Sequence, residues 1–243
     1  MSLPILSHPK FNDTIPSTKQ PISYRPFLVK EQKILLMAAE SKDPKSIEQA
    51  TKDVLKACIL TKIDIDSLAT FDIEYLFLRL RSKSVGEKLT LTFHHHNDHN
   101  REGVECKVHT KFEVDLDTVN VEFDPVHSKD IKLTDDIIIT MRYPTFDVLS
   151  KLTDATVSSS NNPYVNIVAE SIETIFQGEQ TFSSTDYTLE DKVAFIENLT
   201  ETQFTKILKF FETMPKLKHI IKYKCTGCDQ EDQYKLEGLT DFF

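Results

Sequence analysis

The sequence predicts an α+β protein with two helix-rich halves, each followed by a small antiparallel β-hairpin or sheet. Between residues 30 and 85 apolar residues recur every three or four positions, which is the spacing of amphipathic helices. From residue 88 to residue 116 apolar and polar residues alternate instead, as they do in half-buried strands. Helical spacing returns after residue 163, and the last residues again have the pattern of a hairpin.

The first 22 residues are predicted to form an extended, irregular arm. Proline lacks the backbone N–H group that helices and sheets use, and this segment contains Pro4, Pro9, Pro16 and Pro21. A short apolar strand is expected at Phe27–Val29, followed by a helix that begins near Lys30. The run from Ile34 to Ala39 is apolar on every side, which predicts burial on more than one face of that helix.

Two further helices are expected in the first half. Asp43 and Pro44 form a helix start, because aspartate accepts hydrogen bonds from free N–H groups and proline suits the first helical position. The next helix, "DIEYLFLRLRS" at residues 72–82, places four apolar residues on one stripe: Ile73, Leu76, Phe77 and Leu80. We expect this stripe to pack with Phe27 and the first helix in an N-terminal core.

Residues 88–93 and 104–116 are predicted to form the two strands of a hairpin, joined by the stretch "HHHNDHNREG". In the second strand the apolar residues share one face and the charged residues share the other. Two more strands are expected at residues 130–133 and 137–142, before a short helix that follows Pro144.

A boundary is predicted at Ser158–Asn162, where only small polar residues occur. It divides the chain into the arm (1–22), an N-terminal helical and hairpin domain (23–157) and a C-terminal helical domain (158–243).

The C-terminal domain is predicted to hold three helices and a hairpin. Pro163 opens a helix whose apolar stripe extends to Phe176 and which Gly178 ends. A second helix covers residues 189–199, and the capping-box sequence at Thr200–Gln203 starts a third. The final hairpin turns through Cys225-Thr-Gly-Cys228.

Composition excludes several classes of function. The net charge of −9 disfavours a general affinity for nucleic acid or anionic lipid, because phosphate binding needs clustered Lys and Arg. No apolar run approaches the roughly 18 residues that a membrane span needs. Only five glycines are present, and no phosphate loop, nucleophile elbow or zinc-protease motif occurs, so we expect no enzyme. Four cysteines do not form a disulfide framework, which indicates a reducing cytoplasm.

A cluster of histidines in the first hairpin has spacing typical of zinc ligands, with His96-x-x-His99 followed by Cys106-x-x-His109. Strand geometry argues against this set, because residues three apart in a strand point to opposite faces. His94, His96 and His109 could instead meet on the outer face and hold a metal through imidazoles alone. The simpler interpretation is a solvated, polar hairpin tip.

Cys225-x-x-Cys228 is the better candidate for a structural zinc half-site, because two thiols on a hairpin turn match a zinc knuckle. No second ligand pair follows it, so a complete site would need His219, the histidines of the other hairpin or another chain. A redox role is less consistent with the pattern, since redox motifs lie between a strand and a helix. The remaining alternative is a turn that tightens the hairpin without any metal.

Two stretches carry a family resemblance: "RPFLVKEQKILLMAAES" (Arg25–Ser41) and "FDIEYLFLRLRSKSVGE" (Phe71–Glu87). They resemble paired signatures of the base plate proteins of T-even-type contractile-tailed bacteriophages. The C-terminal "MPKLKHIIKYKCTGCDQEDQYKLEGLTDFF" is similar to the Cys-bearing hairpin and the Gly-Leu-x-x-Phe-Phe ending of that family. Family members also carry a Cys-x-x-Cys knuckle in the first hairpin, where this chain has "HHHNDH", so no metal ligand is transferred to those positions.

At this length the chain is most similar to the family's base plate hub assembly proteins. The resemblance implies a non-enzymatic tail morphogenesis factor that binds other base plate hub proteins in the host cytoplasm, with no nucleic acid or membrane as partner. Two alternatives stay open: a structural hub subunit retained in the tail base plate of the virion, and a zinc-binding module with a nucleic-acid or redox role. The oligomeric state is left open by the sequence.

Overall fold

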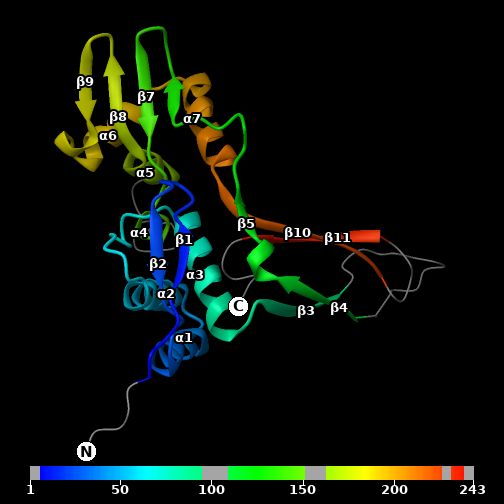
Figure 1. Cartoon of the computed structure of the whole chain (residues 1–243). Coiled ribbons are helices and arrows are strands. Elements are labelled where there is room, and N and C mark those ends of the chain that lie inside the picture. Colours follow the sequence, from blue (N-terminus) through cyan, green and yellow to red (C-terminus); the bar gives the residue numbers. More distant parts are fainter. Residues whose placement is uncertain (1–5, 95–108, 151–162, 226–230, 238–243) are drawn as a thin grey trace, which may run out of the picture. The chain divides into compact units, whose positions relative to one another are not determined.

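The computed structural model describes residues 6–94, 109–150, 163–225 and 231–237, and it confirms the predicted α+β class (Figure 1). The chain divides into two compact units. Unit 1 comprises residues 1–63, 71–122 and 216–243, and unit 2 comprises residues 64–70 and 123–215. The predicted boundary at Ser158–Asn162 lies outside the described residues, and the division into domains proposed from the sequence stays a prediction.

Unit 1 begins with a β-hairpin where an irregular arm was predicted. Strands β1 (Phe11–Thr14) and β2 (Pro21–Tyr24) pair antiparallel. Ile15 and Ile22 are buried, and that burial holds the hairpin against the unit. The turn is fixed by Ser17, whose Oγ donates to Asp72 Oδ2 over 2.5 Å. Pro16 and Pro21 are compatible with this hairpin, because Pro16 lies in the turn and Pro21 is the first residue of β2.

Three helices follow: α1 (Val29–Ser41), α2 (Pro44–Cys58) and α3 (Thr70–Val85). The predicted start of α2 is confirmed, since Asp43 accepts hydrogen bonds from the backbone N–H groups of Lys45 and Ser46. The stripe predicted on α3 is also confirmed as core, with Ile73, Leu76, Phe77 and Leu80 all buried. The strand predicted at Phe27–Val29 is absent, because Val29 already belongs to α1.

Arg79 connects α3 to the segment that follows the first long hairpin. Its guanidinium donates to the carbonyl of Leu116 over 2.9 Å, to that of Val119 over 3.0 Å and to Asn120 Oδ1 over 2.9 Å. The guanidinium also lies over the ring of Tyr75. These contacts stabilise the charge of Arg79, whose burial would otherwise be costly.

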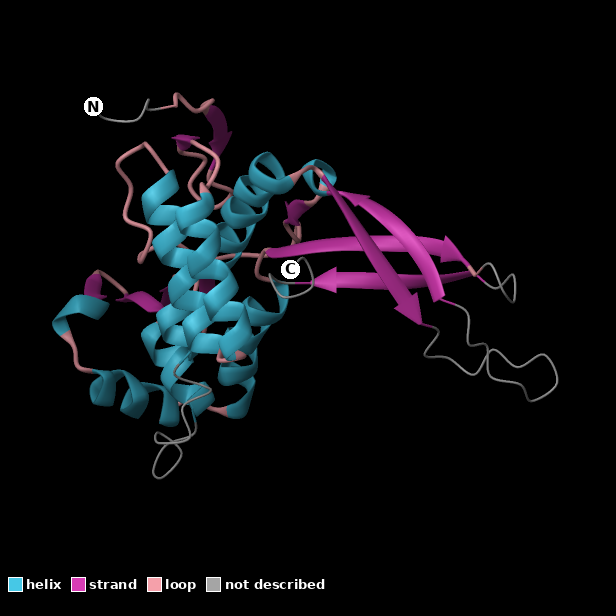
Figure 2. Ribbon diagram, turned by 90° about the horizontal axis from the view of Figure 1, so that it is seen from below, coloured by secondary structure: helices cyan, strands magenta, loops and turns pink. Residues whose placement is uncertain are grey.

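The rest of unit 1 is two small sheets. Strands β3 (Lys88–His94) and β4 (His109–Asp115) form one hairpin, in the alternating pattern predicted for these residues. Positions 104–108 of the predicted second strand lie outside the described residues, and Leu116 belongs to the turn that follows β4. A short 3-10 turn, η1 (Leu116–Thr118), leads into β5 (Asn120–Glu122). β5 pairs with β10 (Lys216–Lys224), which pairs with β11 (Glu231–Glu237). Figures 1 and 2 show both long hairpins extending away from α3 and crossing each other in the view of Figure 2.

Unit 2 is a four-stranded antiparallel sheet with helices. Its strands are β6 (Asp130–Lys132), β7 (Ile137–Met141), β8 (Ile172–Gln177) and β9 (Gln180–Ser183), in that order. Its helices are α4 (Phe146–Ser150), α5 (Pro163–Glu170), α6 (Leu189–Glu197) and α7 (Glu201–Thr213), with a 3-10 turn, η2 (Ser184–Asp186), before α6. The predicted capping box that starts α7 is confirmed. The core of the unit lies between the sheet and the helices and includes Ile139, Met141, Ile172, Ile207 and Phe210.

The helix predicted from Pro163 through Phe176 is wrong beyond Glu170. The N–H of Ser171 closes α5 by bonding to the carbonyls of Ile167 and Val168, and the next residues form β8. The stretch "IETIF" is rich in β-branched residues, which favours a strand. Gly178 does not end a helix but makes the turn between β8 and β9, with a φ of +57° that suits glycine.

No described helix combines the length and the apolar character that crossing a membrane requires.

Candidate functional site

Three of the residues that the sequence singled out, His94, His109 and Cys225, lie at the far ends of two hairpins that pack together. Phe112 of β4 and Tyr223 of β10 bring the hairpins into contact, with their ring centroids 4.8 Å apart. Both hairpins extend in the same direction, so the end of β4 that carries His109 and the end of β10 lie at the same end of the pair (Figure 2).

The structure places only part of the predicted metal-ligand set. In the backbone register of the first hairpin, His94 pairs with His109, whose side chain is exposed. Cys225 follows β10 directly and is buried. His96 and Cys228 lie outside the described residues. Within the described ranges no three His, Cys, Asp or Glu side chains are placed to hold a metal ion. The structure thus brings the two candidate half-sites to neighbouring hairpins, and the ligand set stays a prediction.

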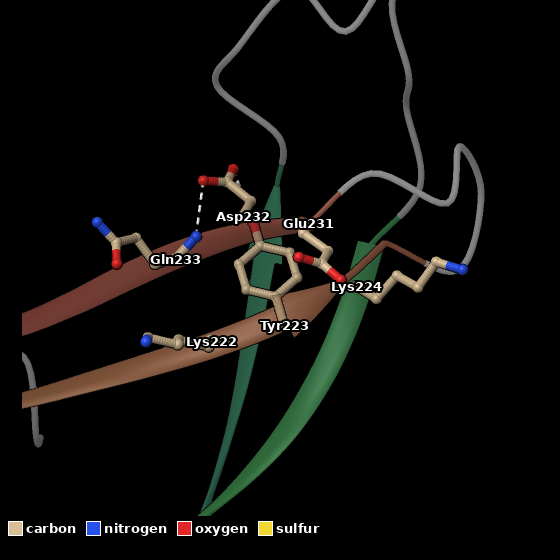
Figure 3. A pocket seen from close by; sticks show the side chains of 6 residues that line it. All are labelled: Lys222, Tyr223, Lys224, Glu231, Asp232 and Gln233. Atoms are coloured by element: carbon tan, nitrogen blue, oxygen red, sulfur yellow. Dashed lines mark hydrogen bonds between the residues drawn. The ribbon is translucent and has the colours of Figure 1, made fainter.

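A polar hollow of about 540 Å³ lies along β10 and β11 (Figure 3). The lining residues are Lys222, Tyr223, Lys224, Glu231, Asp232 and Gln233. Tyr223 donates its hydroxyl to Asp232 Oδ2 over 3.3 Å, and the backbone N–H of Gln233 donates to Asp232 Oδ1 over 2.7 Å. The lining has equal numbers of basic and acidic side chains, so its described groups suit polar contacts.

The start of α1 is anchored by a buried ion pair that sequence reasoning missed. Arg25 Nη2 donates to Glu31 Oε1 over 2.9 Å and to the carbonyl of Ala57, at the end of α2, over 3.0 Å. The other oxygen of Glu31 accepts the backbone N–H of Leu28 over 2.8 Å. Only 3% of the Glu31 side chain is exposed. Burial alone raises the pKa of Glu31, but the hydrogen bonds from Arg25 and Leu28 outweigh it and hold the pKa below its ordinary value.

Cys58 lies beside this ion pair and is fully buried. Burial raises the pKa of its thiol to about 11, so the thiol stays protonated at neutral pH. Cys58 is therefore a packing residue rather than a reactive one.

The burial predicted for α1 is wrong. The helix packs on α2 through one side only, and its buried residues are Glu31 and Ala38. Exposure is high for Met37 (72%), Val29 (68%) and Leu36 (55%). The apolar run that suggested a core helix instead provides an apolar outer surface.

Unit 2 contains an open apolar groove between the sheet and α6. Its volume is about 310 Å³, and it is lined by Ile137, Ile172, Ile175, Gln177, Phe182, Ser184, Tyr187, Asp191, Lys192 and Phe195. Tyr187 lies at its rim, 44% exposed, with its ring centroid 6.3 Å from that of Phe182. Lys192 donates to Ser184 Oγ over 3.2 Å. An apolar hollow with a few polar groups at its edge has the character of a binding pocket.

A second feature of unit 2 that sequence reasoning missed is the hydrogen-bonded ring of His127. Its Nδ1 lies 3.0 Å from Thr213 Oγ1 and its Nε2 lies 3.1 Å from the hydroxyl of Tyr143. The hydroxyl of Thr213 donates to the carbonyl of Lys209, so the same hydroxyl accepts the hydrogen bond from Nδ1 of His127. Nε2 of His127 then carries no proton and accepts the hydrogen bond from the hydroxyl of Tyr143. Burial lowers the pKa of His127, in agreement with a neutral ring. The partners lie 16 and 86 positions away in the chain, so no local motif signals them.

Comparison with protein families matches residues 8–243 to the family described as T4 bacteriophage base plate protein. No curated protein and no solved structure matches the chain. The family match covers almost the whole sequence, including both units and the two stretches whose resemblance was noted above. The chain belongs to the T4 bacteriophage base plate protein family.

Proposed function

We propose that this protein is a non-enzymatic tail morphogenesis factor that assists assembly of the central hub of the base plate by binding hub subunits in the host cytoplasm. Membership of the base plate family supports a partner among the other base plate proteins. The observation that carries the proposal is the open apolar groove of unit 2, with the exposed Tyr187 at its rim.

The groove suits a protein partner better than a small polar substrate. Its walls are mainly aliphatic and aromatic side chains from β7, β8, β9 and α6. Asp191, the acidic residue in its lining, already accepts hydrogen bonds from Thr188 at the start of α6. An aromatic residue beside an apolar hollow is the usual form of an energetic anchor in protein interfaces. We therefore place the hub-subunit contact at this groove.

Replacing Tyr187 with Glu should weaken binding to the hub subunit, because the substitution puts a charge where the partner's apolar surface must be desolvated. We expect the affinity to fall by about a hundredfold, which corresponds to an anchor of about 2–3 kcal/mol. The measurement is co-purification of the tagged chain with each hub subunit of the same phage, expressed together one pair at a time, followed by titration of the pair that binds.

The matched control is Phe176→Glu. Phe176 has a similar exposure of 38% and follows Ile175 in β8, but Ile175 lines the groove while Phe176 does not. This control should keep its binding. If both variants lose binding to the same extent, or both retain it, the groove is not part of the interface.

A second candidate function is a structural zinc module, favoured by the contact between Phe112 and Tyr223 that joins the two hairpins. In this proposal Cys225 and Cys228 supply two thiolates, and the histidine-rich hairpin is the source of further ligands, with His109 at its described edge. Zinc there would contribute to folding rather than to chemistry.

Substituting Cys225 and Cys228 with Ser should release zinc and lower the melting temperature together if this second proposal is right, because a structural metal supplies folding free energy. Metal analysis and thermal unfolding of the same preparations measure both effects. If the purified parent protein contains no zinc, the proposed zinc site is wrong. A variant that melts like the parent yet no longer supports hub assembly would make the turn a direct contact instead.

A further inference from the structure

The outward side of α1 carries apolar and charged residues in an order that would match the same side of a second, antiparallel copy of the helix. The residues facing away from Glu31 and Ala38, the buried side, are Val29, Lys33, Leu36 and Glu40, with Met37 beside them. They are spaced i, i+4, i+7 and i+11, which makes one straight stripe along a helix. All five are exposed.

We propose that this stripe binds the same stripe of a second copy of this chain, in an antiparallel helix pair. Placing the twofold axis between Leu36 and Met37 sets Leu36 opposite Met37 of the second copy. The same axis sets Lys33 opposite Glu40, and Glu40 opposite Lys33. One symmetric contact thus joins two apolar pairs at its centre and two ion pairs beside them.

The charges select both the partner and its direction. Lys33 and Glu40 are two helical turns apart, about 10.5 Å along the axis, so they do not neutralise each other within one helix. Neither of them has an ion-pair partner within the described ranges. A parallel arrangement in register would put Lys33 against Lys33, whereas the antiparallel arrangement pairs opposite charges twice.

The helix is held firmly enough to present this surface. Its first turn is fixed by the Arg25–Glu31 ion pair and by the hydrogen bond from Leu28 to Glu31, both on the side away from the stripe. The stripe residues take no part in these bonds, so substituting them leaves the anchor of α1 intact. The inference is separate from the hub-subunit contact, which we placed on unit 2.

The test is the association state of the full chain, measured by sedimentation velocity over a concentration series. The parent chain should form a dimer. Lys33→Glu and Glu40→Lys should each weaken dimerisation by about tenfold or more, because by symmetry each substitution creates two like-charge contacts. Leu36→Ser combined with Met37→Ser should weaken it at least as much by removing the apolar centre. Circular dichroism and melting temperature confirm that each variant is folded.

Two rescue experiments make the test specific. The double variant Lys33→Glu/Glu40→Lys should dimerise like the parent. An equimolar mixture of the two single variants should form a heterodimer, because one chain then presents only acidic and the other only basic stripe residues. A monomeric parent at about 100 µM, a dimer indifferent to these substitutions, or a mixture that does not associate would each overturn the proposal. A monomeric parent whose Leu36/Met37 variant loses the hub subunit would reassign the stripe to that partner.

Discussion

Glu31→Ala should lower the free energy of unfolding by about 3 kcal/mol, because it leaves the guanidinium of Arg25 largely buried without its counter-ion. The same substitution removes the acceptor for the backbone N–H of Leu28, which holds the first turn of α1. The measurement is chemical denaturation of the parent and the variant under identical conditions.

Gln32→Ala is the matched control, since Gln32 is the next residue of the same helix turn and is exposed. It should change stability by no more than about 0.5 kcal/mol. A Glu31 variant as stable as this control would show that the ion pair does not hold α1 in place.

The ion pair also predicts a pH dependence. Because the pKa of Glu31 is lower in the folded chain, its contribution to stability is fully present above the ordinary carboxyl value of 4.5. It is lost as the pH falls through the lower pKa of the folded state. The parent should therefore lose more stability on acidification than Glu31→Ala does. If the free energy of unfolding falls equally with pH in the parent and in Glu31→Ala, Glu31 does not contribute this pH dependence.

Phe77→Ala should cost about 3–5 kcal/mol, because it leaves a cavity in the centre of unit 1. The Phe77 side chain is 1% exposed and lies on the buried stripe of α3 with Ile73 and Leu80. Urea denaturation measures the loss of stability. If the free energy of unfolding falls with urea concentration at the same rate in parent and variant, the variant still unfolds from the same compact state.

Val85→Ala is the control for this substitution, since Val85 is the last residue of α3 and is 62% exposed. It should cost less than about 0.5 kcal/mol. A loss for Phe77→Ala below about 1 kcal/mol would mean that Phe77 is not a core residue and is available for docking.

Local signals allowed much of the fold to be predicted from the sequence. The start of α2 depends on Asp43 and Pro44, and the start of α7 depends on a capping box, so neighbouring residues suffice to predict both. The alternation that predicted β3 and β4 is likewise a property of consecutive residues. Each of these features was confirmed because the physical cause lies within a few positions.

The errors arose where the outcome depends on residues far away. The run from Ile34 to Ala39 predicted the helix correctly but not its burial, because burial depends on which neighbours cover the helix. α2 packs on one side of α1, and Leu36 and Met37 stay exposed. The apolar residues from Val165 to Phe176 fit helical spacing throughout, yet Ile172 and its successors pair with β7 and β9. Pairing with other strands overrode the helical pattern.

For the candidate sites, the sequence predicted individual residues but not which of them lie close together in the fold. The packing of Phe112 on Tyr223, which joins the two hairpins, connects residues more than a hundred positions apart. The groove of unit 2 is likewise made by three strands, a 3-10 turn and a helix. No single stretch of the sequence carries either arrangement.

We propose that this chain assists assembly of the hub as a morphogenesis factor, rather than remaining in the finished particle as a hub subunit. Quantitative immunoblotting of infected cells, applied to separated assembly intermediates and to finished particles, tests it most directly. We predict that the chain accompanies hub subunits in the intermediates and is absent from purified virions. A constant, stoichiometric amount in finished particles would contradict the claim and identify the chain as a structural subunit of the hub.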